Sequence, residues 1–167
     1  MFRKVFLVIP IFMALCCCLG CPYSDFAYLL VTEEPNKTDI VGRYTLTLQT
    51  LTAEGLEVLG GKEATIELQS GGTYIATNFP IWKRTETSKY TQTNLLTTTG
   101  SWNIETLGGV DHGDGEIHDV WGICFQGLQV ERPRACADLS GPKHPYSLMF
   151  VYGDPDSDQV MIFERKP

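Results

Sequence analysis

EATIELQSGGTYIAT, residues 63–77, is the stretch of the sequence that decides the fold. Its first half alternates apolar and polar residues, with Ala64, Ile66 and Leu68 in the apolar positions. Alternation with a period of two places one set of side chains on a core face and the other set in water. The two glycines that follow are typical of a tight turn, and residues 73–77 resume a β-like pattern. The stretch therefore predicts an antiparallel β-hairpin.

Short β-like runs recur on both sides of this hairpin, and no long helical stripe of period 3.6 accompanies them. Upstream, Tyr44, Leu46 and Leu48 alternate with polar residues. Downstream, strands are expected at residues 85–99, 101–105, 117–130, 147–152 and 159–165. Residues 131–145 contain three prolines and are interpreted as a loop. The sequence predicts an all-β, antiparallel domain with seven to eight strands in a small barrel or, alternatively, a β-sandwich.

Two aromatic stretches have an expected placement within this plan. In residues 117–130 we expect Ile117, Trp121, Ile123 and Phe125 to share the face that points to the core. FPIWKR, residues 79–84, is partly basic and contains a proline in an acidic protein. It is interpreted as a loop at the mouth of the barrel or a partner contact, with Trp82 tucked against the base of a loop as the alternative.

Three short motifs resemble those of lipocalin-like (calycin) domains. DIVGRY, residues 39–44, resembles the start of the first strand in that family. GGTY, residues 71–74, resembles the glycine-aromatic hairpin of small bacterial members, and GSW, residues 100–102, resembles a mid-strand motif of theirs. The resemblance covers about residues 39–167 and implies a small lipocalin-like barrel.

The resemblance also implies a barrel floor. It implies that Tyr44, Trp102 and Arg165 converge at one end of the barrel, where Arg165 covers the ring of Tyr44. The planar guanidinium of arginine is suited to stacking on an aromatic face.

The first twenty-one residues are typical of a secretory signal. Arg3 and Lys4 precede an apolar run, and the run ends in Leu19-Gly20-Cys21, which resembles the lipobox of bacterial lipoproteins. We expect residues 1–20 to be removed, Cys21 to carry the lipid, residues 21–38 to form a tether and residues 39–167 to form the folded domain. A transmembrane helix and a plain cleaved signal are the alternatives, but the apolar run is shorter than the ~20 residues a bilayer requires.

The anchor predicts an extracytoplasmic protein held to a membrane of the cell envelope. Pro22 follows the cysteine, where an aspartate would favour retention in the inner membrane of enteric bacteria. The outer membrane is therefore favoured if the cell has one.

Charge and cysteine content limit the partners further. The chain has 13 basic and 20 acidic residues, and removal of Arg3 and Lys4 leaves 11 basic residues and a net charge of −9. Such a protein is repelled by nucleic acid. Four of the six cysteines lie in the first 21 residues, which leaves Cys124 and Cys136 for a disulfide in an oxidising compartment. A metal site with two cysteines is the alternative.

Polar clusters offer weaker candidates for chemistry. DHGDGEIHD, residues 111–119, could hold a divalent metal, but its spacing matches no metal motif and favours a glycine-rich loop. Asp154, Asp156 and Asp158 have the spacing that begins a calcium loop, and a plain turn is the alternative. The chain has no Gly-x-Ser-x-Gly motif. We assign no catalytic residue, metal or cofactor.

Two functions follow as leading hypotheses. The first is an anchored barrel that binds a small apolar ligand or acts as a scaffold. The second is an interaction protein that inhibits an extracytoplasmic hydrolase such as lysozyme, for which an acidic surface suits a basic target. An envelope hydrolase is a third. An empty interior favours the first hypothesis, and a filled interior favours the second.

Overall fold

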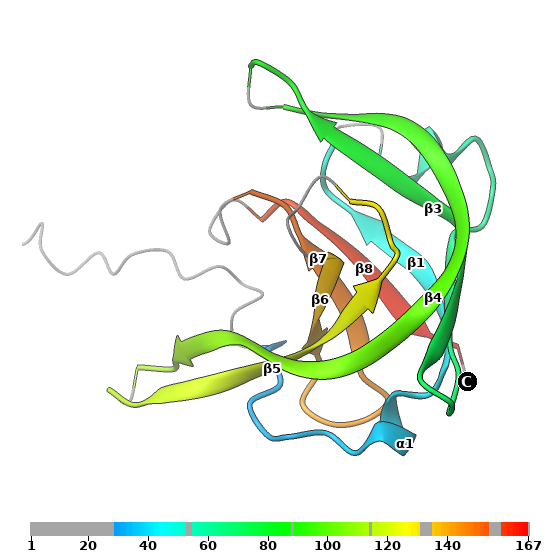
Figure 1. Cartoon of the computed structure of the whole chain (residues 1–167). Coiled ribbons are helices and arrows are strands. Elements are labelled where there is room, and N and C mark those ends of the chain that lie inside the picture. The colour runs from blue at the N-terminus through cyan, green and yellow to red at the C-terminus, as the bar shows by residue number, and fades with distance from the viewer. Residues whose placement is uncertain are drawn as a thin grey trace, which may run out of the picture.

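The computed structural model describes residues 29–52, 55–87, 89–113, 115–130, 135–153 and 158–166. Eight antiparallel strands form one closed barrel in sequence order (Figure 1). The elements are α1 (Lys37–Ile40), β1 (Gly42–Gln49), η3 (Gly55–Leu59), β2 (Thr65–Leu68), β3 (Thr73–Arg84), β4 (Tyr90–Asp111), β5 (Ile117–Gln126), β6 (Ala135–Ser140), β7 (Ser147–Val151) and β8 (Val160–Arg165). Pairing of β1 with β8 closes the sheet and removes its edges. The predicted all-β barrel is confirmed, and the sandwich alternative is wrong.

The hairpin that decides the fold is formed by β2 and β3. Leu68 pairs with Tyr74 across the turn, and Gly72 takes a φ of 81°, which glycine adopts without strain. Ile66 and Leu68 are buried, whereas Glu67 between them is exposed. The period of two in the sequence therefore corresponds to a core face and a solvent face.

β4 is one continuous strand of 22 residues, where two strands at residues 85–99 and 101–105 were expected. A Cβ atom at Gly100 would lie 2.1 Å from the carbonyl oxygen of Gln126 and 2.7 Å from Cε1 of Tyr74. The glycine therefore marks a close approach between neighbouring strands and does not break the strand. The first half of β4 pairs with β3 and the second half with β5.

β3 extends to Arg84 and includes residues 79–84, so the expected loop at this stretch is wrong. The pairing with β4 shifts register between Ala76 and Phe79, where Asn78 has a φ of 51°. Such an irregularity lets a strand contain a proline, here Pro80, near the bulge.

β6 lies within residues 131–145, where only a loop was expected. Ala137 and Leu139 are fully buried at alternate positions of this strand. Pro142 and Pro145 follow the strand. The prolines of residues 131–145 predicted a loop for the whole stretch, but they lie outside the six residues that form the strand.

Five buried aromatic rings contact one another in the interior and form what we name the ring network. Tyr74 contacts Phe125 with ring centroids 5.1 Å apart, and Phe125 contacts Phe150 at 5.8 Å. Phe150 also contacts Phe79 at 5.2 Å and Phe163 at 5.7 Å. All five side chains are buried, and they come from β3, β5, β7 and β8. The network thus joins opposite walls of the barrel through its centre.

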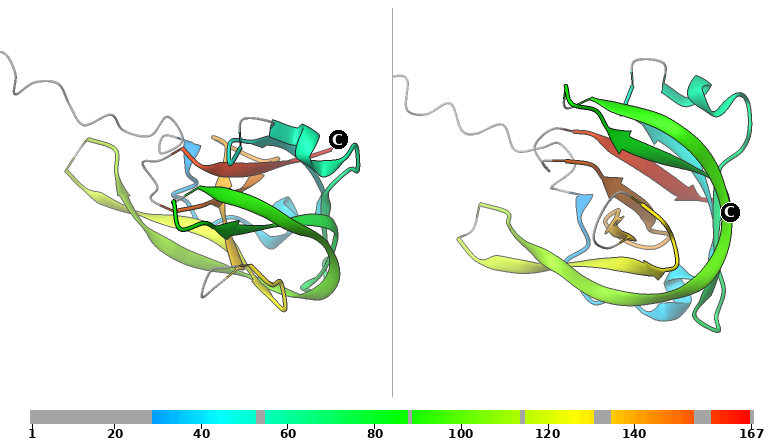
Figure 2. Two further views of the ribbon diagram at one scale, coloured as in Figure 1. Left: turned by 90° about the horizontal axis from the view of Figure 1, so that it is seen from above. Right: turned by 45° about the horizontal axis from the view of Figure 1, so that its top comes forward.

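The described part of the expected tether is bound to the barrel. The backbone N–H of Val31 donates to the carbonyl of Leu139 at 3.0 Å, and its carbonyl accepts from the N–H of Trp121 at 2.9 Å. Leu30 forms a bridge with Ser140, so residues 29–31 lie between β5 and β6. α1 follows at the same end of the barrel (Figures 1 and 2). Cys21 and the signal at residues 1–20 lie outside the described residues.

Candidate functional site

The three residues predicted for the barrel floor all contact α1. The hydroxyl of Tyr44 donates to the carbonyl of Ile40 at 2.5 Å. Nη1 of Arg165 donates to the carbonyl of Asp39 at 2.9 Å. Each of these contacts uses a backbone acceptor in the single turn of α1.

Trp102 reaches the same helix from β4. Nζ of Lys37, the first residue of α1, lies 5.0 Å from the centroid of the Trp102 ring. The indole Nε1 donates to the carbonyl of Gln69 in the turn between β2 and β3 at 3.2 Å. α1 therefore closes this end of the barrel, and stacking of Arg165 on the ring of Tyr44 stays a prediction.

The floor is built around a glycine that leaves room for Arg165. Tyr44 pairs with Arg165 across β1 and β8. A Cβ atom at Gly42 would lie 2.5 Å from Nε of Arg165. Burial raises the pKa of Tyr44 to about 12, and the positive charge of Arg165 opposes part of this rise. The Tyr44 hydroxyl therefore keeps its proton near neutral pH and serves as a structural donor.

The disulfide is confirmed. Cys124 and Cys136 are bonded, face each other directly in the β5–β6 ladder and have Cα atoms 4.1 Å apart. The bond joins two strands at the point where β5 leaves the barrel wall.

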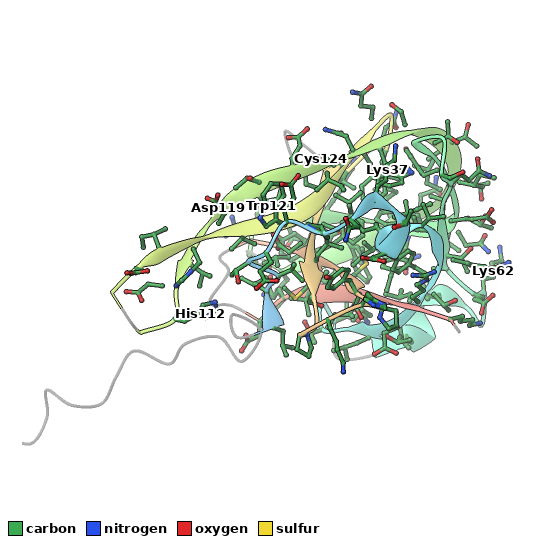
Figure 3. All side chains as sticks on the ribbon, turned by 90° about the horizontal axis from the view of Figure 1, so that it is seen from below. Lys37, Lys62, His112, Asp119, Trp121 and Cys124 are labelled. Atoms are coloured by element: carbon green, nitrogen blue, oxygen red, sulfur yellow. A yellow bond between two sulfur atoms is a disulfide. The ribbon has the colours of Figure 1, made fainter. Side chains whose placement is uncertain are left out.

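β4 and β5 continue past this point as a projecting two-stranded ribbon, which we name the ribbon and define as residues 106–111 and 117–121. Its pairs run from Thr106 with Trp121 to Asp111 with Ile117. Figures 1 and 2 show it reaching away from the barrel, with its outer end far from α1. Figure 3 shows Asp119 and Trp121 along it, between its outer end and Cys124.

The expected inward orientation of Ile117 is wrong. Ile117 is 74% exposed, whereas Ile123 and Phe125 on the same strand are buried as expected. Trp121 is partly buried and packs against the core, and Val120 is buried. Ile117 lies at the outer end of β5, beyond the barrel, where it has no core to face.

The polar loop at the end of the ribbon is organised as a turn. Oδ1 of Asp111 accepts from the backbone N–H groups of Gly113 at 2.7 Å and Gly115 at 3.1 Å. The rings of His112 and His118 have centroids 5.6 Å apart. In the described part of the chain, no group of three or more His, Cys, Asp or Glu side chains is arranged to hold a metal. Asp114 lies outside the described residues, as do Asp154 and Asp156 of the calcium hypothesis.

Trp82 does not form a surface contact. Its side chain is buried, and Nε1 donates to Sδ of Met161 at 3.2 Å on β8. The partner contact expected at residues 79–84 is therefore wrong for this tryptophan, although Lys83 and Arg84 of the same stretch are exposed.

No protein-family model, curated protein or solved structure matches this chain. Among the described residues, no helix is both long and apolar enough to cross a membrane.

Proposed function

We propose that this protein is a non-catalytic barrel, tethered to a membrane of the cell envelope, that binds another extracytoplasmic protein through its outer surface. The observation that carries the proposal is the ring network, because its buried, mutually contacting rings lie in the interior that a small ligand would have to enter. A binding function then has to use the outside of the barrel.

The energetics of the interior support this choice. Phe150 contacts three other rings, and Tyr44 and α1 close the floor beneath the network. Removing a buried phenylalanine side chain from such a core costs about 3–5 kcal/mol. A ligand that displaced one of these rings would have to offset a cost of this size before it gained any affinity.

The tether rests on the sequence of residues 1–21 and agrees with the fastening of residues 29–31. If Cys21 carries the lipid, seven residues lie between it and Leu29, so the two residues are at most about 29 Å apart. Residues 29–31 are hydrogen-bonded to β5 and β6, so a tether of this kind would join the barrel there.

The charge supports a basic partner. The mature chain carries a net charge of −9 after removal of Arg3 and Lys4. Charge complementarity of this kind raises association rates and disfavours partners of the same sign.

The test uses the full chain, purified in detergent, in two titrations. The first follows the fluorescence of N-phenyl-1-naphthylamine, an apolar probe, and the second follows binding and inhibition of lysozyme, a basic hydrolase with an open cleft. We expect saturable lysozyme binding that weakens as salt increases, and no saturable binding of the probe. Stoichiometric probe binding together with absent lysozyme binding would restore the ligand hypothesis and overturn the proposal.

A further inference from the structure

The ribbon leaves backbone edges open. Among the described residues, β3 pairs with β4 only as far as Ser101, and β6 pairs with β5 only as far as Gly122. The ribbon lies beyond both limits. Residues 106–111 and 117–120 therefore have one described partner strand each, as do residues 79–84 and 90–96 of the β3–β4 hairpin, whereas Trp121 also binds Val31. Open strand edges are ready-made contact surfaces for another chain.

The ribbon is nevertheless a supported element. A Cβ atom at Gly122 would lie 2.2 Å from Cδ1 of Leu107, and one at Gly109 would lie 2.5 Å from Cγ2 of Ile117. Two apolar side chains therefore rest on two glycines of the opposite strand. Together with the disulfide at its base, this packing holds the ribbon in a preformed conformation, which lowers the entropic cost of binding.

The chemistry of the ribbon differs from that of the barrel. Ile117 is 74% exposed, the highest value among the large hydrophobic residues described as exposed. Residues 90–130 contain no lysine or arginine. The same stretch contains five acidic residues: Glu105, Asp111, Asp114, Glu116 and Asp119. The ribbon thus combines an exposed apolar side chain with a purely acidic charge.

We propose that the ribbon is the docking element of this protein and that its occupant is a basic protein whose open cleft receives the ribbon with Ile117. This inference rests on the proposed function and names the surface and the partner class. A second copy of the chain is disfavoured, because two ribbons would bring like charges together. An anionic lipid surface is disfavoured for the same reason.

The test compares the full chain with variants of the ribbon and of the barrel wall. Ile117→Ser removes the apolar contact. Glu116→Lys with Asp119→Lys reverses one charge in the loop at the end of the ribbon and one on the ribbon itself. Glu67→Lys with Glu164→Lys makes the same change of charge at exposed positions on β2 and β8 and is the matched control. Lysozyme is the probe, and cytochrome c is a basic protein without an open substrate cleft.

We expect each ribbon variant to weaken lysozyme binding by about tenfold or more, as truncation at a centre of an interface does. The control variant, Glu67→Lys with Glu164→Lys, should change lysozyme binding by less than about threefold, because it alters only the general electrostatic attraction between the two proteins. Any binding of cytochrome c should be the same for the unmodified chain and for the ribbon variants. Circular dichroism of each variant checks that the barrel is intact.

The outcomes separate the two proposals. If the unmodified chain binds lysozyme and the ribbon variants bind equally well, the ribbon is not the docking element, and the proposed function stands. If the unmodified chain binds neither protein, both proposals fail. The unmodified chain could instead self-associate or bind phosphatidylglycerol vesicles. If Ile117→Ser abolishes either behaviour, the ribbon has another occupant and the inference is overturned.

Discussion

The inner and outer halves of β5 belong to the same strand but differ in almost every physical respect. In the inner half, Ile123 and Phe125 are buried, and Cys124 is bonded to the neighbouring strand. In the outer half, Ile117 is exposed, and β4 is the one described strand that pairs with residues 117–120, whereas Trp121 also binds Val31. Two-stranded hairpins are at best marginally stable in water without a core. The outer half therefore depends on the barrel that supports it and contributes little to the stability of that barrel.

This difference assigns separate tasks to the two regions. The interior is apolar and tightly connected, as expected of a region that supplies the free energy of folding. The ribbon is acidic and projecting, and its one large exposed apolar side chain has no role in a core. A substitution in the interior should therefore change stability, and a substitution in the ribbon should change binding.

The largest expected effect tests the interior. Phe150→Ala removes the ring that contacts Phe79, Phe125 and Phe163, and should lower the free energy of unfolding by about 3–5 kcal/mol. Urea unfolding followed by tryptophan fluorescence measures the change. Ile117→Ala is the matched control in the ribbon and should change the same quantity by less than about 0.5 kcal/mol. Equal effects at the two positions would remove the distinction between the regions.

The next effect concerns the boundary between them. Replacement of Cys124 and Cys136 by serine removes a cross-link that closes 12 residues and should cost about 3 kcal/mol in the chain-entropy model. The double variant is compared with the unmodified chain in urea, with and without reductant. Reductant should destabilise only the unmodified chain. A reductant effect of the same size in the serine variant would show that the bond is not its source.

The sequence was sufficient for the part of the fold in which one face of each strand is buried. The alternation in residues 63–77 and around Tyr44 predicted β1, β2 and β3, because a period of two requires a core on one side. The expected inward orientation of Leu48 is wrong, because the register shifts between Leu46 and Leu48 and leaves Leu48 exposed. Cys124 and Cys136 were predicted to pair because they are the two cysteines that remain after the signal. The alternation is a local signal, and the cysteine pairing follows from the number of cysteines.

What the sequence missed depends on contacts between distant residues. Residues 85–99 and 101–105 were expected to form two strands, but Gly100 lies within one strand and allows Gln126 and Tyr74 to approach. The ribbon could not be predicted, because alternation identifies a strand but does not indicate where along that strand the barrel ends. The absence of lysine and arginine from residues 90–130 is the sequence signal that this region differs from the rest.

A smaller effect tests the floor and depends on pH. Tyr44→Phe removes the hydrogen bond to the carbonyl of Ile40 and should cost about 1–2 kcal/mol near pH 8. The pKa of Tyr44 is about 12 in the folded protein against 10.0 for the ordinary side chain. A raised pKa gives a contribution that is complete below pH 10 and is lost as the pH rises toward 12.

The unmodified chain should therefore lose stability between pH 10 and pH 12, whereas the Tyr44→Phe variant should lose less over the same window. Burial also raises the pKa of Tyr74, which is present in both proteins and cancels in the comparison. The free energy of unfolding is measured from pH 8 to pH 11.5. A difference between the two proteins that does not change with pH would contradict the assignment to Tyr44.

The smallest effect on global stability is expected at the outer end of the ribbon, where it sharpens the comparison most. Asp111→Ala removes the acceptor for the N–H groups of Gly113 and Gly115, so the turn between β4 and β5 loses two hydrogen bonds. Because no part of the core depends on this turn, global unfolding should change by less than about 1 kcal/mol. Local opening should change more, since elements without a core open independently of the rest. Amide hydrogen exchange should therefore accelerate in residues 106–111 and 117–121 and stay unchanged at Phe125 and Phe150. If exchange accelerates equally in the ring network, the ribbon and the barrel unfold as one unit, and the ribbon cannot be treated as a separate element supported by the core.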